Sequence, residues 1–149
     1  MASFWLTNRV ANPVLRRALR TPVGRRLGRG LAVLRYTGRR TGTPHELVCQ
    51  YARDGDTVWV LVGAADRKTW WRNLRDGADV DLWLAGEHVR ARAVAVEGAV
   101  APEEAAAGLT AYLAAVPAAA RTLGLARHPP PDEVARAATR ATLVRATRI

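Results

Sequence analysis

One short turn combines residue types that could bind a charged ligand. It consists of Gly38, Arg39, Arg40, Thr41 and Gly42, directly after the apolar run LAVLRYT. Glycines allow a tight turn with exposed backbone N–H groups, the two guanidinium groups carry fixed positive charge, and the threonine adds a hydroxyl donor. The combination indicates a site for an anionic group such as a phosphate. The alternative interpretation is a β-hairpin turn with two solvated arginines. The turn is not a P-loop, because the pattern GxxxxGK[ST] is absent.

The remaining side chains do not form an obvious catalytic pair. Cys49, the only cysteine, follows His45 by four residues; on one strand the two would share a face but lie too far apart to react together. The acidic residues have structural interpretations: turns for Asp54 and Asp56, helix caps for Asp66 and Asp132, and the polar face of a strand for Asp79 and Asp81. On that strand Val80, Leu82 and Leu84 share the opposite, apolar face. No cysteine and histidine spacing typical of a metal site is present. We therefore expect a bound cofactor to perform any reaction.

Positive charge is concentrated near the N-terminus. The formal net charge is +10; residues 1–45 hold ten arginines and no acidic residue, whereas the rest of the chain holds 13 basic and 13 acidic side chains. Such a block favours an anionic partner: a phosphorylated cofactor, nucleic acid or an anionic membrane surface. Because no nucleic-acid-binding motif is present, we expect no nucleic-acid partner.

A basic amphipathic helix is predicted near the N-terminus, with Asn12 as its cap and Pro13 as its first residue. Its apolar stripe could pack against the protein's own core or lie on a membrane surface, and both interpretations stay open. The sequence has no apolar run of the roughly 20 residues that cross a bilayer, and no signal peptide. The predicted location is cytoplasmic, with peripheral membrane contact as an option.

The elements that must position the glycine turn are mostly strands. Strand-like runs cover residues 31–38, 45–52, 57–63, 79–85, 87–97 and 140–149. Asp-Gly at residues 54–55 predicts a hairpin, and Asp66 is expected to cap a helix that Gly77 ends. Pro102 opens a helix to about Val116, with the acidic Glu103 and Glu104 in its first turn. This order predicts a mainly β (α+β) fold, a six-stranded antiparallel barrel with peripheral helices. We expect a single domain, 1–149, divided into a basic N-terminal helix and connector (1–30), a barrel core (31–98), and helices with the final strand (99–149).

The glycine turn belongs to a longer string that resembles a known family. LRYTGRRTGTPHELVCQYARDGDTVWVLVG, followed by WWRNL and VRARAVAVEG, is similar to the deazaflavin-dependent nitroreductase family, which includes quinone reductases. The resemblance implies a split β-barrel, binding of coenzyme F420 (a 5-deazaflavin), and hydride transfer from its reduced form to a quinone or a nitro compound. FMN on the same barrel is the alternative cofactor, and a non-catalytic binding module is a third possibility. Monomer and homodimer both stay open.

The resemblance also implies roles for individual residues. Arg39, Arg40 and Thr41 would hold the cofactor's phosphate and acidic tail. The end of the third strand would line the deazaflavin ring, and the WWRNL segment would complete the site; these residues are Leu61, Val62, Gly63, Ala64, Lys68, Trp70, Trp71 and Asn73. Either tryptophan could equally be a core residue, and Asn73 could brace a neighbouring loop. Where the family carries two basic residues and a proline, this chain has Thr43, His45 and Val48, and Val48 is retained as a candidate cofactor contact. Tyr112 is the tyrosine that could contact the acceptor.

Overall fold

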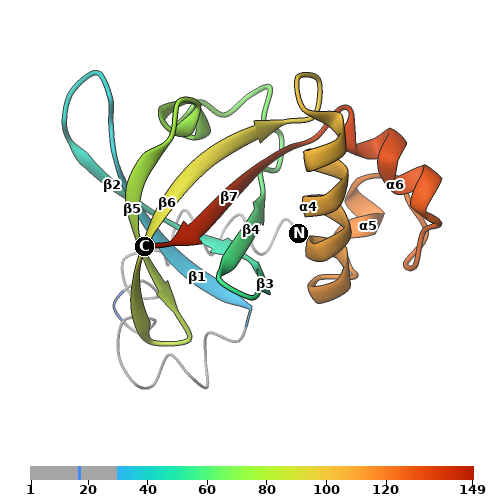
Figure 1. Ribbon diagram of the computed structural model, residues 1–149, viewed down its shortest axis with the longest axis horizontal. Coiled ribbons are helices and arrows are strands. Elements are labelled where there is room, and N and C mark those ends of the chain that lie inside the picture. The colour runs from blue at the N-terminus through green and yellow to red at the C-terminus, as the bar shows by residue number, and fades with distance from the viewer. Residues whose placement is uncertain (1–16, 18–29) are drawn as a thin grey trace.

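A computed structural model describes residues 17 and 30–149 of the chain, which form one curled antiparallel sheet with helices at one end (Figure 1). The strands are β1 (Leu31–Thr37), β2 (Pro44–Gln50), β3 (Ala52–Asp54), β4 (Thr57–Leu61), β5 (Ala78–Leu84), β6 (Glu87–Glu97) and β7 (Thr142–Arg148). The helices are the 3₁₀ helix η1 (Trp70–Leu74), α4 (Pro102–Ala115), α5 (Ala119–Thr122) and α6 (Pro131–Ala138). The mainly β prediction is confirmed. The predicted N-terminal helix and connector lie outside the described residues, apart from Arg17 and Gly30.

The sheet has seven strands in the described region, so the prediction of six was wrong. Its order is β2-β1-β5-β6-β7-β4-β3, and the two outermost strands, β2 and β3, are consecutive in the chain with only Tyr51 between them. The run that looked like one strand therefore divides. β2 pairs with β1, whereas β3 pairs with β4 at the opposite edge. Because one residue joins the two edges, the sheet must curl, and it forms a half-barrel.

Alternation along the strands separates an apolar interior from a polar outer face. Val80, Leu82 and Leu84 of β5 point into the half-barrel, as predicted, and they pack with inward residues of β1, β4, β6 and β7. The alternate residues Asp79 and Asp81 point outward. The hairpin from β5 to β6 turns on Ala85 and Gly86, both with positive φ, which suits the twist of paired strands.

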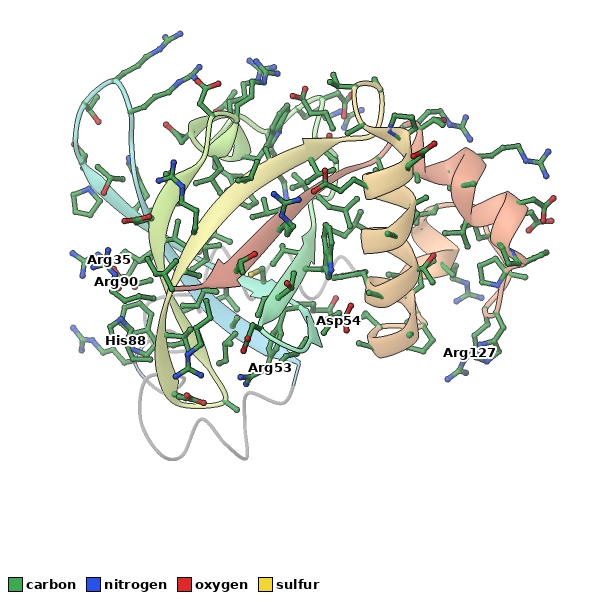
Figure 2. The ribbon with its side chains drawn as sticks, in the orientation of Figure 1. Arg35, Arg53, Asp54, His88, Arg90 and Arg127 are labelled. Atoms are coloured by element: carbon green, nitrogen blue, oxygen red, sulfur yellow. The ribbon has the colours of Figure 1, made fainter. Side chains whose placement is uncertain are left out.

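The outward side chains of β5 and β6 pair with each other. Asp79 accepts from Arg92 at 3.3 Å, and Asp81 lies 2.8 Å from the His88 ring nitrogen. In Figure 2 the labelled His88 and Arg90 are found on the side of the sheet away from the helices. The structural interpretation of the two aspartates is therefore confirmed, and neither has a place in a carboxylate pair for catalysis.

A second core lies between the sheet and the helices. Trp59 of β4 and Leu143 of β7 face α4 and pack with its Leu109, Tyr112 and Leu113. The helix begins at Pro102 and has acidic residues in its first turn, as the sequence predicted. α6 closes this core from its other side, next to α4 (Figure 1). α4, α5 and α6, like every other described helical segment, are too short or too polar to span a bilayer.

Two predicted helix caps were wrong. Asp66 lies in a turn closed by bonds from the N–H groups of Arg67 and Lys68 to the Ala64 carbonyl, and η1 begins only after Thr69. The carboxylate is thus one turn too early to cap the helix. Asp132 lies inside the first turn of α6, whose cap position is Pro130, because the extended proline loop ends two residues earlier than expected.

Candidate active site

The glycine turn between β1 and β2 is closed by its own backbone. The Gly38 N–H donates to the Thr43 carbonyl at 2.8 Å, and the Gly42 N–H donates to the Gly38 carbonyl at 2.8 Å. Gly42 has a φ of 71°, which a side chain would oppose. The Thr43 N–H donates to the Thr41 hydroxyl oxygen at 3.3 Å. The predicted tight turn is therefore present, and it brings both arginines to its tip.

Three donors of this turn have no acceptor within the described residues. The backbone N–H groups of Arg40 and Thr41 take part in none of the hydrogen bonds of residues 30–149. The Thr41 hydroxyl accepts a bond from Thr43, and its own proton stays available. Successive backbone N–H groups in a turn bind anions well, especially next to fixed positive charge. The turn therefore offers two amides and one hydroxyl to an oxyanion.

The helix η1 forms the opposite side of the site. Its Trp71 and Leu74 are buried in the barrel core, and the Trp71 indole N–H donates to the Ala65 carbonyl at 3.0 Å. Anchoring this face of a tight helix leaves Trp70, Arg72 and Asn73 directed towards the glycine turn. The sequence predicted the segment as a helix, and the structure gives it the 3₁₀ form because its first backbone bond joins Arg72 N–H to the Thr69 carbonyl.

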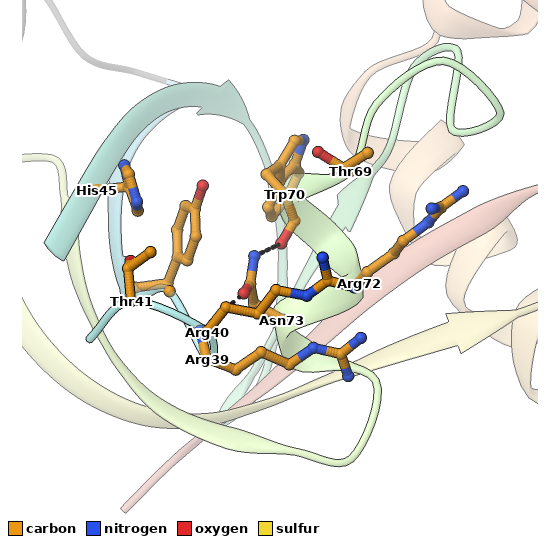
Figure 3. A pocket seen from close by; sticks show the side chains of 10 residues that line it. Arg39, Arg40, Thr41, His45, Thr69, Trp70, Arg72 and Asn73 are labelled. Carbon is orange, nitrogen blue, oxygen red and sulfur yellow. Dashed lines mark hydrogen bonds between the residues drawn. The ribbon is translucent and has the colours of Figure 1, made fainter. Parts of the chain in front are cut away.

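Asn73 connects the two sides directly. Its side-chain oxygen accepts the backbone N–H of Arg39 at 2.9 Å, across 34 residues of sequence, and its side-chain nitrogen donates to the Trp70 carbonyl at 2.8 Å. Both bonds are drawn as dashed lines in Figure 3, where the Asn73 side chain reaches from η1 to the glycine turn. The glycine turn is thereby held against the helix.

A pocket of about 420 Å³ opens between the turn and the helix. It is lined by Tyr36, Gly38, Arg39, Arg40, Thr41, His45, Thr69, Trp70, Arg72 and Asn73 (Figure 3). Among the described residues, its lining contains three arginines and no acidic residue. The described part of the pocket wall thus combines positive charge with aromatic surface and contains no carboxylate side chain.

Three rings form the aromatic part of the wall. Tyr36 and His45 are directly paired across β1 and β2, and their rings stack with centroids 5.4 Å apart. The ring of Trp70 approaches Tyr36 from η1, with centroids 6.0 Å apart. Burial raises the pKa of the Tyr36 hydroxyl above its ordinary 10.0, so this residue is a neutral hydroxyl donor at neutral pH. A flat ligand ring could pack against this surface.

The three pocket arginines have uncompensated charges. Within residues 30–149, neither Arg39 nor Arg40 nor Arg72 lies within ion-pair distance of a carboxylate. The neighbouring Arg75, in contrast, makes two bonds to Glu97 at 3.0 and 3.1 Å. The guanidinium of Arg72 lies 5.7 Å from the ring centre of Trp71, a cation–π contact that keeps the Arg72 side chain close to η1. Uncompensated cations gathered at one pocket favour the binding of an anion.

The structure brings together about half of the predicted site. Gly38, Arg39, Arg40, Thr41, Trp70 and Asn73 line the pocket, and Gly42 closes the turn beneath it. The other candidates lie outside its lining: Val48, Leu61, Val62, Gly63, Ala64, Lys68 and Trp71. Val48 is buried beside Val33 in a small separate cluster. Tyr112 is buried against the sheet in the second core, so the structure does not bring it to the pocket.

Sequence reasoning missed four lining residues: Tyr36, His45, Thr69 and Arg72. A signal for two of them was present. Because a tight turn pairs the residues that flank it, Tyr36 and His45 had to lie opposite each other on the strands leading to the arginines. Arg72 gave no such signal, since its direction depends on which face of η1 is buried.

Comparison with known proteins now identifies the family. A profile described as F420H(2)-dependent quinone reductase matches residues 6–120. The chain belongs to the F420H(2)-dependent quinone reductase family. The family consists of oxidoreductases that use coenzyme F420, which confirms the resemblance, the enzyme class and the cofactor expected from the sequence.

The chain was also compared with curated proteins and with solved structures. No curated protein matches the chain. Among solved structures, it is similar to an FAD and heme binding protein from Mycobacterium smegmatis, with 16% identity and a TM-score of 0.47, over 93% of this chain and 65% of the other. The chain thus spans slightly less than two thirds of that protein's length.

Proposed function

We propose that this protein binds reduced coenzyme F420 at the pocket between the glycine turn and η1 and transfers its hydride to a quinone. The observation that carries the proposal is the pocket itself, where three uncompensated arginines and the free amides of Arg40 and Thr41 adjoin an aromatic wall. The family match shows the cofactor and supports a quinone as the acceptor.

The residues present fit this cofactor by their chemistry. A phosphate and an acidic tail need fixed positive charge and N–H or O–H donors, and the turn and Arg72 provide both. A flat deazaflavin ring needs apolar, stackable surface, and Tyr36, His45 and Trp70 provide it. Within residues 30–149, no acidic side chain lines the pocket to repel the anionic ligand.

The protein's contribution is binding and orientation. Reduced coenzyme F420 supplies the hydride, which together with one proton converts a quinone to a hydroquinone. Arg39, Arg40 and Arg72 hold the negative charge of the ligand. The rings of Tyr36 and Trp70 exclude water from one side of the pocket, and the protonated Tyr36 hydroxyl can donate a hydrogen bond within it.

Two finer features belong to the same proposal. A nitro compound is a second acceptor class, since it also accepts hydride at an electron-poor group. A membrane quinone is lipid-soluble, and the basic segment at residues 1–30 would bring the pocket to an anionic membrane surface.

Fluorescence titration with coenzyme F420 tests the proposal. We expect saturable binding, weakened in Arg39→Ala/Arg40→Ala, and oxidation of reduced coenzyme F420 on adding a soluble quinone. The same assay with a nitro compound separates the two acceptor classes. Protein that is isolated yellow with bound FMN, or that shows no saturable F420 binding, would contradict the assignment.

A further inference from the structure

We propose that Asn73 is a positioning residue of the anion site, acting through the backbone of Arg39 and not by contact with the ligand. This inference rests on the proposed function, because it concerns the same pocket. It assigns to η1 a second role besides supplying Arg72, which is to fix where the glycine turn lies.

The hydrogen bonds of Asn73 define this role. Its oxygen is taken by the Arg39 N–H at 2.9 Å, and its nitrogen donates to the Trp70 carbonyl at 2.8 Å. The second bond orients the amide, because it fixes which end of the side chain faces the turn. Once both bonds form, the amide has one N–H left, and its acceptor oxygen points at protein backbone.

The turn has no equivalent tie to η1 elsewhere in the described residues. Its other bonds are internal, joining Gly38 with Thr43, Gly42 with Gly38, and Thr43 with Thr41. These bonds shape the turn but do not set its distance from Arg72. The hydrogen bond from the Arg39 N–H to Asn73 therefore couples the turn, which carries Arg39 and Arg40, to η1, which carries Arg72.

The same bond also selects the donors that face a ligand. It occupies the Arg39 N–H and leaves the next two amides, those of Arg40 and Thr41, without a protein acceptor. Asn73 therefore determines which end of the turn binds an oxyanion. If the link is lost, the Arg39 amide is released and the separation between the turn and η1 is no longer fixed.

The experiment combines hydrogen exchange with ligand binding in the full chain. Amide exchange at Arg39, Arg40 and Thr41 is followed by NMR for the wild type, Asn73→Leu and Asn73→Asp. Leucine removes both hydrogen bonds at similar size, whereas aspartate keeps an oxygen for the Arg39 N–H. Binding is measured with coenzyme F420 and with inorganic phosphate. Thr139→Val is the matched control, since it removes one side-chain to backbone bond, 2.7 Å long, at the end of α6.

We expect the Arg39 amide to be protected in the wild type and in Asn73→Asp and to exchange at least about tenfold faster in Asn73→Leu. Affinity for coenzyme F420 should fall about threefold to tenfold in Asn73→Leu, the loss expected for one hydrogen bond, and should not change in Thr139→Val. A fall in affinity with unchanged Arg39 exchange would make Asn73 a direct ligand contact and overturn the proposal, as would unchanged affinity.

Failure of the proposed function and failure of the role of Asn73 give different results. If the wild type fails to bind coenzyme F420, the proposed function fails, but protection of the Arg39 amide and phosphate binding still test Asn73. If Asn73→Leu does not fold, Asn73→Asp decides: loss of Arg39 protection in that variant would refute the hydrogen-bond assignment.

Discussion

Replacing Arg72 by alanine tests whether the anion site spans two elements. Two unit charges 4 Å apart interact by about 1 kcal/mol in water and about 4 kcal/mol at the effective dielectric constant of a protein surface. Arg72 is exposed and so is solvated on one side, which places its contribution near the lower end, at about 1–2 kcal/mol. The dissociation constant for coenzyme F420 should therefore rise about 5- to 30-fold.

The assay is fluorescence titration at low and high salt. Arg53→Ala and Arg127→Ala are matched controls, because each replaces one exposed arginine and lowers the net charge of +10 by the same one unit as Arg72→Ala. Figure 2 shows these two residues at the β3–β4 hairpin and at the helical end. At 1 M salt, where the screening length is about 3 Å, the difference between Arg72→Ala and the wild type should shrink, while Arg72→Lys should restore part of the affinity by charge alone.

Equal affinities of Arg72→Ala and Arg53→Ala would refute this reasoning. That result would mean that η1 contributes only general positive charge and that the turn binds the anion by itself. A loss in Arg72→Ala that persists at high salt would also refute it, since the magnitude was assigned to electrostatics.

Three further predictions concern stability and the aromatic wall. In Gly98→Ala the new methyl group would overlap a backbone carbonyl oxygen of α6, so unfolding free energy should fall by about 3 kcal/mol or more in urea denaturation, whereas Gly63→Ala, with open space around it, should change it little. Burial raises the pKa of the Cys49 thiol from 9.0 to about 12. The unfolded chain therefore loses this proton first, and stability should fall as pH rises from about 9 towards 12, with a smaller fall in Cys49→Ala measured by the same denaturation. Quenching of indole fluorescence by the bound cofactor should be reduced in Trp70→Phe but kept in Trp59→Phe; equal quenching in both would contradict the placement of the ligand beside η1.

Local patterns predicted the strands well. Strict alternation in β5 gave the inward face of Val80, Leu82 and Leu84, and the Asp-Gly pair predicted the hairpin between β3 and β4, because both signals act over a few residues. The glycine turn was predicted for the same reason. What failed was the break at Tyr51, since nothing in an apolar run shows that its two halves pair with opposite edges of a sheet.

Of the candidate site, the sequence predicted mainly the residues of the glycine turn. The turn residues could be named because their chemistry lies in one string. Arg72 enters the pocket through the burial of Trp71 and Leu74, and His45 enters through its pairing with Tyr36, so both depend on contacts between distant segments. The end of β4 was expected at the cofactor by resemblance, and it lies outside the lining of this pocket.

The hydrogen bond between Arg39 and Asn73, across 34 residues of sequence, links cofactor binding to the stability of the folded protein. The pocket needs both the hairpin β1–β2 and the helix η1, which are distant in the sequence, so we expect it to form only when the sheet that carries them has assembled. A ligand that needs both sides should therefore stabilise the whole curled sheet; at a concentration 100-fold above its dissociation constant it would add about 2.7 kcal/mol to the free energy of unfolding. Cofactor supply would then set not only the rate of turnover but also the lifetime of the folded protein.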